Sequence, residues 1–131
     1  MSHTIKILKD DQLVLAQIWG QMDNEAFTQY IDQTESFGEF PDSYRLLLVI
    51  DPNTDFKVET QVIRDLSRRT RVFGINSARV IVASSSLGFG LSRLYSLAAP
   101  TAGDHYTVVR SIDEAAEILA LEVPIIEANL A

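Results

Sequence analysis

Two apolar stretches, LLLVI at residues 46–50 and VIVA at residues 80–83, decide the fold. The longer of the two is far too short to cross a bilayer. A continuous apolar run of this length is typical of a strand that is buried on both faces, as in a parallel sheet. We therefore predict strands at 44–51 and 79–84 that lie side by side and run in the same direction.

Strand and helix patterns alternate through the rest of the chain. Two strand patterns, at 4–9 and 13–20, are separated by a turn and predict an N-terminal β-hairpin. A further strand is predicted at 106–110. Helical spacing of apolar residues predicts helices at 24–37, 58–73, 87–98 and 112–123, the last with a capping box at its start and Pro124 at its end. This order predicts an α/β fold, in which the hairpin is followed by βα units and about four helices pack on a five-stranded, mixed but mostly parallel sheet.

The length of 131 residues and the 47% of hydrophobic residues fit one compact domain, which we place at 1–124. The remaining residues, 125–131, form an apolar C-terminal tail. Right-handed crossovers place most helices on one face of the sheet, so the strand at 46–50 needs cover on its other face. We expect Ile125, Ile126 and Leu130 to pack on the domain or on a second copy, and the chain to form a homodimer.

The composition excludes several classes of protein. Without cysteine, the chain has no disulfide, no Cys-ligated metal and no thiol nucleophile. Eleven Lys and Arg against 18 Asp and Glu give a net charge of −7, which argues against nucleic-acid binding. The one basic cluster, Arg64, Arg68, Arg69 and Arg71, is typical of a solvated helix end, with an anion or partner patch as the alternative. We expect a cytoplasmic protein with no membrane span, no metal and no cofactor.

Two longer stretches resemble a known protein family. They are ARVIVASSSLGFGLSRLY at 78–95 and YTVVRSIDEA at 106–115. Both are similar to the small SpoIIAA-like proteins, a STAS-related family whose members commonly end with a strand, a Phe-Gly-x-x-Arg-type helix, another strand and an Asp-Glu-Ala helix. The N-terminal hairpin and the overall length agree as well, so the resemblance covers nearly the whole chain.

The resemblance implies a small mixed sheet with helices packed on it. It also implies kinship with STAS anti-sigma-factor antagonists and, more distantly, with CRAL-TRIO lipid-binding domains. The antagonists dock a partner kinase and are switched by phosphorylation of a serine in an Asp-Ser-Ser-Gly-type turn. In this chain the corresponding turn, at 50–55, has no serine, and Thr54 is its only hydroxyl residue. The phosphorylation switch is therefore not carried over.

Polar residues follow each predicted parallel strand. Because the carboxyl ends of parallel strands meet at one edge of a sheet, we expect these residues to share a rim at which ligands bind. Arg93 lies about two turns into the helix that follows the serines, where it could reach an anion held by the helix amides. The alternative explanation of this Ser- and Gly-rich turn is structural: the serines cap the helix and the glycines allow it to pack closely on the sheet. The rim residues are Asp51, Asn53, Thr54 and Asp55, then Ser84, Ser85, Ser86, Gly88 and Gly90, then Arg110 and Ser111.

Other candidate groups favour structural roles. Asp51 and Asp55 could form an acid/base pair or hold Mg²⁺, but loop carboxylates of this kind commonly fix turns. His3 and His105 are too distant in sequence to indicate a site, and a Ser–His–Asp triad would require His105 to cross the sheet. An aromatic group is expected to pack in the core or on the hairpin, with an apolar ligand pocket as the alternative. Its members are Trp19, Phe27, Tyr30 and Phe37.

Three functional hypotheses remain open. The first is a non-catalytic regulatory or protein-interaction module of STAS-like type that associates with itself. The second is a binder of a small apolar or amphipathic, lipid-like molecule held between helices and sheet. The third is an enzyme that binds a phosphate or another anion at the turn spanning residues 84–90. Because no catalytic residue set is visible, we favour the first.

Overall fold

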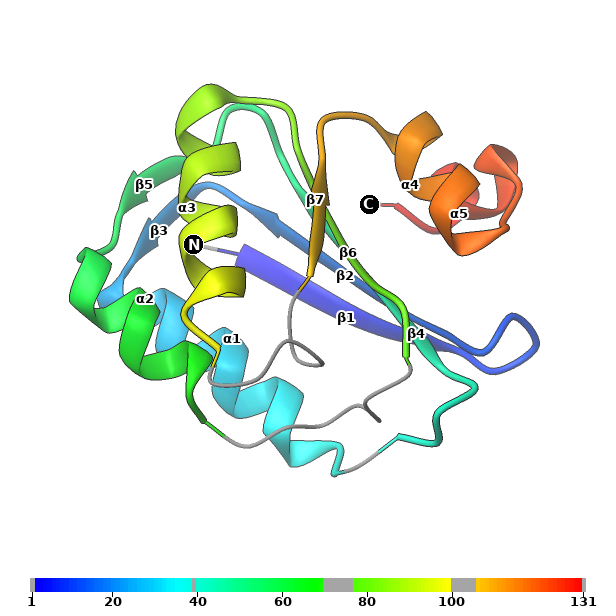
Figure 1. The fold of residues 1–131 in the computed structure, drawn as a ribbon, viewed down its shortest axis with the longest axis horizontal. Helices are drawn as coiled ribbons and strands as arrows, with labels where there is room; N and C mark the ends of the chain where they lie inside the picture. Colours follow the sequence, from blue (N-terminus) through cyan, green and yellow to red (C-terminus); the bar gives the residue numbers. More distant parts are fainter. Residues whose placement is uncertain (1, 39, 70–76, 100–105, 131) are drawn as a thin grey trace.

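A five-stranded β-sheet lies between two layers of helices in the computed structural model, which describes residues 2–38, 40–69, 77–99 and 106–130 (Figure 1). The strand order is β1-β2-β4-β6-β7. The hairpin pair, β1 and β2, is antiparallel and all other neighbours are parallel, which confirms the predicted α/β class and sheet. The strands are β1 (Ser2–Leu8), β2 (Leu13–Trp19), β4 (Arg45–Ile50), β6 (Arg79–Ala83) and β7 (Thr107–Val109).

The two apolar stretches form the central pair, with Leu48 opposite Ile81 in parallel register. Successive side chains of a strand point to opposite faces, so each stretch contributes to two cores. Leu48, Ile50 and Ile81 belong to the core on one face, while Leu47 and Val80 belong to the core on the other. Leu47 is 0% exposed, as expected for a strand that is covered on both faces.

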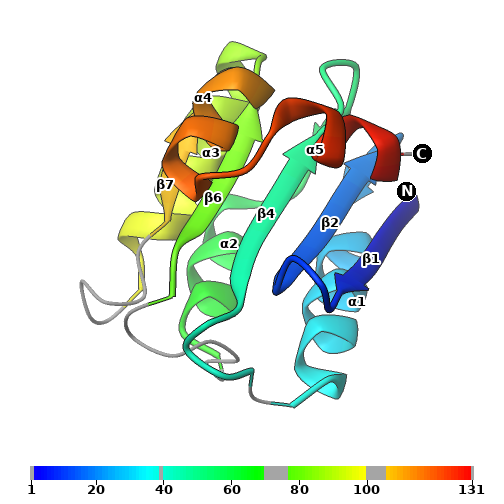
Figure 2. The same cartoon turned by 90° about the vertical axis from the view of Figure 1, so that its right-hand side faces the viewer.

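The helices divide unequally between the two faces. Helices α1 (Asn24–Ser36), α2 (Thr60–Ser67) and α3 (Ser86–Leu97) cover one face (Figure 1). Helices α4 (Ile112–Leu119) and α5 (Val123–Asn129) cover the other, where Figure 2 shows them in front of the sheet. The chain thus builds a three-layer sandwich from the βα order that the sequence predicts.

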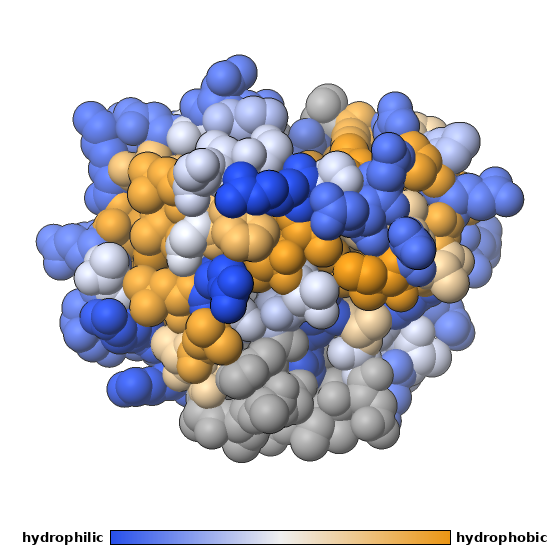
Figure 3. All heavy atoms as spheres, turned by 45° about the horizontal axis from the view of Figure 1, so that its top comes forward, coloured by the Kyte–Doolittle hydropathy of each residue, from blue (hydrophilic) through white to orange (hydrophobic). Residues whose placement is uncertain are grey.

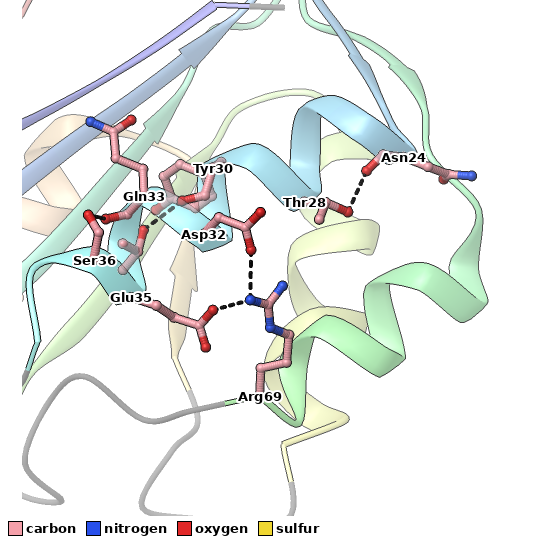
Figure 4. Close-up of polar contacts among 9 residues, drawn as sticks. Asn24, Thr28, Tyr30, Asp32, Gln33, Glu35, Ser36 and Arg69 are labelled. Carbon is pink, nitrogen blue, oxygen red and sulfur yellow. Dashed lines mark hydrogen bonds and ion pairs between the residues drawn. The ribbon is translucent and has the colours of Figure 1, made fainter.

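An ion-pair cluster ties the end of α2 to α1. The Arg69 guanidinium lies between the carboxylates of Asp32 and Glu35, with 2.7 Å between Arg69 Nη2 and Asp32 Oδ1 (Figure 4). Of the predicted basic cluster, Arg64 and Arg68 are exposed and Arg71 lies outside the described residues. Arg69 therefore holds two helices together at the end of α2.

A second, two-stranded parallel sheet was not predicted. It joins β3 (Gln21–Asp23) to β5 (Asp55–Lys57), which continue the chain after β2 and β4. Gly20, at a φ of 82°, separates β2 from β3. Two neighbouring parallel strands thus pair again after a bend, and this brings Phe56 of β5 against the core below α3.

Two predicted helix boundaries are wrong. Val58 lies before α2 rather than within it, because β5 occupies the preceding residues. Pro124 does not end the last predicted helix: α4 ends at Leu119, and Ala120 takes a left-handed conformation with a φ of 54°. Pro124 instead lies in the first turn of α5, where a missing backbone N–H costs nothing.

The predicted tail packs on its own domain. Ile126 of α5 is 0% exposed and belongs to the same core as Leu47, Leu119 and Val80. Lys6 of β1 also donates a hydrogen bond of 2.6 Å to the backbone carbonyl of Asn129. Because α4 and α5 cover the second face of the sheet, this face does not require a second subunit.

Replacing Ile126 with Ala tests the contribution of α5. We expect a loss of about 3 kcal/mol in the free energy of unfolding, because a fully buried branched side chain is removed. Ile118→Ala is the matched control, since Ile118 on α4 is 46% exposed, and it should cost less than about 1 kcal/mol. Urea unfolding measures both. Equal losses in the two variants would show that α5 does not pack as described.

Candidate functional site

A cavity of about 60 Å³ lies between the sheet and the helices α1, α2 and α3, and it is partly open to the surface. We call it the aromatic cavity. Its walls are aliphatic and aromatic side chains from the three helices, from the central strands and from the segment between β5 and α2. Among them are Phe27, Ile63, Ile81, Leu91 and Tyr95.

The cavity exists because α3 turns small residues toward the sheet. The buried residues of this helix are Gly88, Ser92 and Ser96, which recur every fourth position and so share one side. Its large residues Leu87 and Leu97 face away from the core and are 58% and 59% exposed. The distribution differs from that of an ordinary surface helix, because Leu91, Leu94 and Tyr95 are only partly buried against the core while the fully buried positions are small. It leaves the volume beneath α3 unfilled.

Aromatic rings form a connected group around the cavity. Phe27 is stacked on Tyr30, with 6.4 Å between ring centroids, and meets Tyr95 edge-on at 5.5 Å. Tyr95 in turn meets Tyr106 edge-on at 5.6 Å. The three tyrosines line the cavity together with Thr34 and Ser92 among otherwise apolar side chains, which is typical of a site for an apolar ligand with few polar atoms.

The tyrosine hydroxyls on α1 and α3 are held in their neutral form. Burial raises the pKa of Tyr30 well above its ordinary value, and a nearby Tyr106 adds to the effect. Burial, and then the proximity of Tyr106 and Tyr30, raises the pKa of Tyr95 in the same direction. The cavity therefore presents phenols rather than phenolates, and these can donate hydrogen bonds.

The two buried serines of α3 differ in their hydrogen bonding. Ser96 Oγ accepts from the Tyr106 backbone N–H at 2.6 Å and lies 3.1 Å from the Tyr106 carbonyl oxygen, to which it donates. Ser92 lines the cavity and is 5% exposed, yet its hydroxyl meets no hydrogen-bond partner among the described residues. Ser96 thus fixes α3 to β7, whereas Ser92 leaves a polar group directed at the cavity.

The predicted anion turn is occupied by local contacts. Ser85 caps α3 by accepting the Gly88 backbone N–H at 3.0 Å. The Arg110 guanidinium lies 4.3 Å from the centroid of the Phe89 ring and 3.5 Å from the Ser84 carbonyl oxygen. Ser84 and Ser86 are exposed beside them. An anion site at this turn stays a prediction.

The two glycines of the turn differ in their surroundings, and Arg93 lies apart from the cavity. A Cβ atom on Gly88 would lie 2.8 Å from Ser85 Oγ and 3.3 Å from the Phe56 ring, so this position requires glycine for close packing. A Cβ atom on Gly90 would meet nothing within 4 Å. Arg93 is exposed on α3.

The loop after β4 lies on the predicted rim, because β4 and β6 run parallel side by side. Within it, Asp51 Oδ1 accepts the Asn53 backbone N–H at 2.8 Å, and the Thr54 hydroxyl donates to the Asp51 carbonyl at 2.8 Å. Asp55 begins β5 and forms an exposed ion pair with Lys57 at 3.9 Å. These contacts are typical of a turn, in agreement with the structural role that the sequence favours for Asp51 and Asp55. No group of three or more His, Asp or Glu residues within the described ranges could hold a metal.

The histidines and Trp19 contribute little to the site. His3 contacts the side chain of Gln33, and its ring lies 5.7 Å from that of Tyr30. His105 lies outside the described residues. Trp19 does not join the aromatic group around the cavity, because it occupies an odd-numbered position of β2, on the opposite face from Ile18.

Part of this site was predictable from the sequence. Phe27 and Tyr30 were expected to pack in the core or on the hairpin, with an apolar pocket as the alternative, whereas Tyr95, Tyr106 and the cavity role of Ser92 were missed. The sequence pattern that could have indicated the cavity lies within α3, where small residues recur at every fourth position. Of these small residues, Gly88 was assigned to an anion-binding turn, and Ser92 and Ser96 were given no role.

Comparisons with known protein families, with curated proteins and with solved structures found no match to this chain. The resemblance to SpoIIAA-like proteins therefore stays a prediction, and function is argued from the site. None of the helices in the described part of the chain has both the length and the apolar character needed to span a bilayer.

The tyrosines predict a stability that falls at high pH. Because burial raises the pKa of Tyr30 in the folded state, the unfolded chain loses this proton first, near pH 10. The stability from the neutral phenol is complete below about pH 10 and is lost as the pH rises further, by up to about 1.4 kcal/mol per pH unit. Urea midpoints between pH 8 and pH 11 should fall less steeply in Tyr30→Phe than in the wild type. Parallel curves would contradict the burial of this hydroxyl.

Proposed function

We propose that the protein binds a small apolar or amphipathic molecule in the aromatic cavity. The observation that carries this proposal is the unfilled volume of about 60 Å³ within a core whose surrounding side chains are well buried. Protein interiors are normally packed to crystal-like density with few voids of this kind. A cavity with apolar walls and a few hydroxyl groups is the usual form of a small-molecule site.

The cavity has an energetic cost that supports a functional role. At roughly 24 cal/mol per Å³, an empty volume of about 60 Å³ costs about 1.4 kcal/mol of stability. Of the small buried residues on α3, Ser92 lines the cavity, and a larger side chain there is the direct means of filling it, because Ser92 has no described hydrogen-bond partner to lose. Binding a ligand in this volume would recover the lost contacts.

Xenon provides a direct test, because it enters apolar cavities without needing a polar contact. We expect dissolved xenon to shift the methyl NMR signals of Ile63 and Ile81 in the wild type. Leu91→Phe places a larger ring in the cavity wall and should abolish these shifts. Leu97→Phe makes the same change on the exposed side of α3 and should leave them intact.

Two results would count against ligand binding. One is a wild-type spectrum that xenon does not change. The other is an unaltered response in Leu91→Phe, which would place the xenon elsewhere. Native mass spectrometry of freshly purified protein would reveal, as an increase in mass, any molecule that stays bound through purification.

As a second function we propose a non-catalytic interaction module that self-associates through α3. The observation that favours it is the apolar side of this helix, on which Leu87, Gly90 and Leu97 are exposed and Leu94 is half-buried; Figure 3 shows apolar surface on this side of the molecule. These residues recur at the i, i+3, i+7, i+10 spacing of a helix–helix seam, which a second copy of the same helix matches. A Cβ atom at Gly90 would meet open space, so a partner helix could approach closely there.

Replacing Leu87 and Leu97 together with Lys tests the α3 surface. We expect wild-type protein to sediment as a dimer and the double variant as a monomer with an unchanged circular dichroism spectrum. Ile118→Lys introduces a charge at another exposed apolar position, on α4, and should not alter the mass. A wild-type monomer at high protein concentration would dismiss this second function without affecting the first.

A further inference from the structure

The hydroxyl of Ser92 is a buried polar group without a described partner. Ser92 is 5% exposed and lines the aromatic cavity, and no hydrogen bond reaches it from the described residues. Leaving a buried hydroxyl unsatisfied lowers stability, whereas alanine at this position would remove the unsatisfied group. The neighbouring Ser96, one turn away, has both a donor and an acceptor on the Tyr106 backbone.

The walls of the cavity restrict the charge of its occupant. None of the described residues that line it is charged at neutral pH, and burial keeps Tyr30 and Tyr95 protonated. An ion placed there would lose its hydration without gaining a counter-charge, which is strongly unfavourable. A neutral molecule with an aliphatic body meets no such cost.

From these observations we infer that Ser92 is the polar anchor of the site, and that its ligand is a neutral apolar molecule with one hydrogen-bonding group. The inference rests on the proposed binding function and specifies its ligand class. The Ser92 hydroxyl donates to, or accepts from, the single polar group, while the aliphatic part of the ligand packs against Ile63, Ile81 and Leu91. The open side of the cavity leaves room for a longer chain to extend outward.

Propane and ethanol are suitable probes, because they have nearly the same shape and differ by one hydroxyl. Affinities are measured from methyl NMR shifts in the wild type and in Ser92→Ala. We expect propane to bind both proteins equally, within about twofold. Ethanol should bind Ser92→Ala about tenfold more weakly than the wild type, the loss of about one buried hydrogen bond. Ser92→Ala without ligand should melt at a higher temperature, whereas Ser96→Ala should melt lower.

The outcomes separate this inference from the proposed function. If propane binds the wild type but the affinity for ethanol is unchanged in Ser92→Ala, Ser92 is not the anchor and the apolar site still stands. If Ser92→Ala is less stable than the wild type, its hydroxyl is structurally satisfied and the inference fails. If propane binds neither protein, the proposed function fails and the inference fails with it.

Discussion

The parallel pairing of β4 with β6 is the constraint on which the rest of the structure depends. Five consecutive residue pairs join these strands, and their side chains alternate between two separate cores. Because both faces are apolar, helices must cover both, and because the strands are parallel, each connection must cross a face. The three-layer architecture and the shared edge of the following loops are consequences of this one pair.

The orientation of α3 is set by polar contacts rather than by its apolar residues. The Ser85 cap fixes its start, and the hydrogen bonds of Ser96 to the backbone of Tyr106 fix its last turn against β7. Gly88 allows Phe56 to approach between them. If the helix were turned by half a rotation, its leucines would fill the space beneath it, but the Tyr106 N–H would lose the Ser96 hydroxyl that it contacts. The hydrogen bonds therefore favour the orientation that leaves the core incompletely packed.

The parts of the fold that were predictable from sequence are those with strong local patterns. Residues 46–50 and 80–83 are continuous apolar runs, and the predicted capping box starts α4, where Ser111 accepts the Glu114 backbone N–H. The strands β3 and β5 escaped prediction because a three-residue strand has no measurable periodicity and forms only through a long-range pair. Helix α5 was taken for a tail because proline both ends helices and begins them, and only tertiary packing distinguishes the two.

The candidate site was less predictable than the fold for a related reason. A cavity depends on which side of a helix faces the sheet, and the leucines of α3 recur along one side, which the structure leaves partly exposed. The hydrophobic pattern therefore does not give the observed rotation, which depends on the contacts of Ser85, Gly88 and Ser96. The same rotation exposes Leu87 and Leu97 and buries Ser92. The interior cavity and the exposed apolar side of α3 are thus two results of one orientation, so a change that turned the helix would remove both proposed functions together.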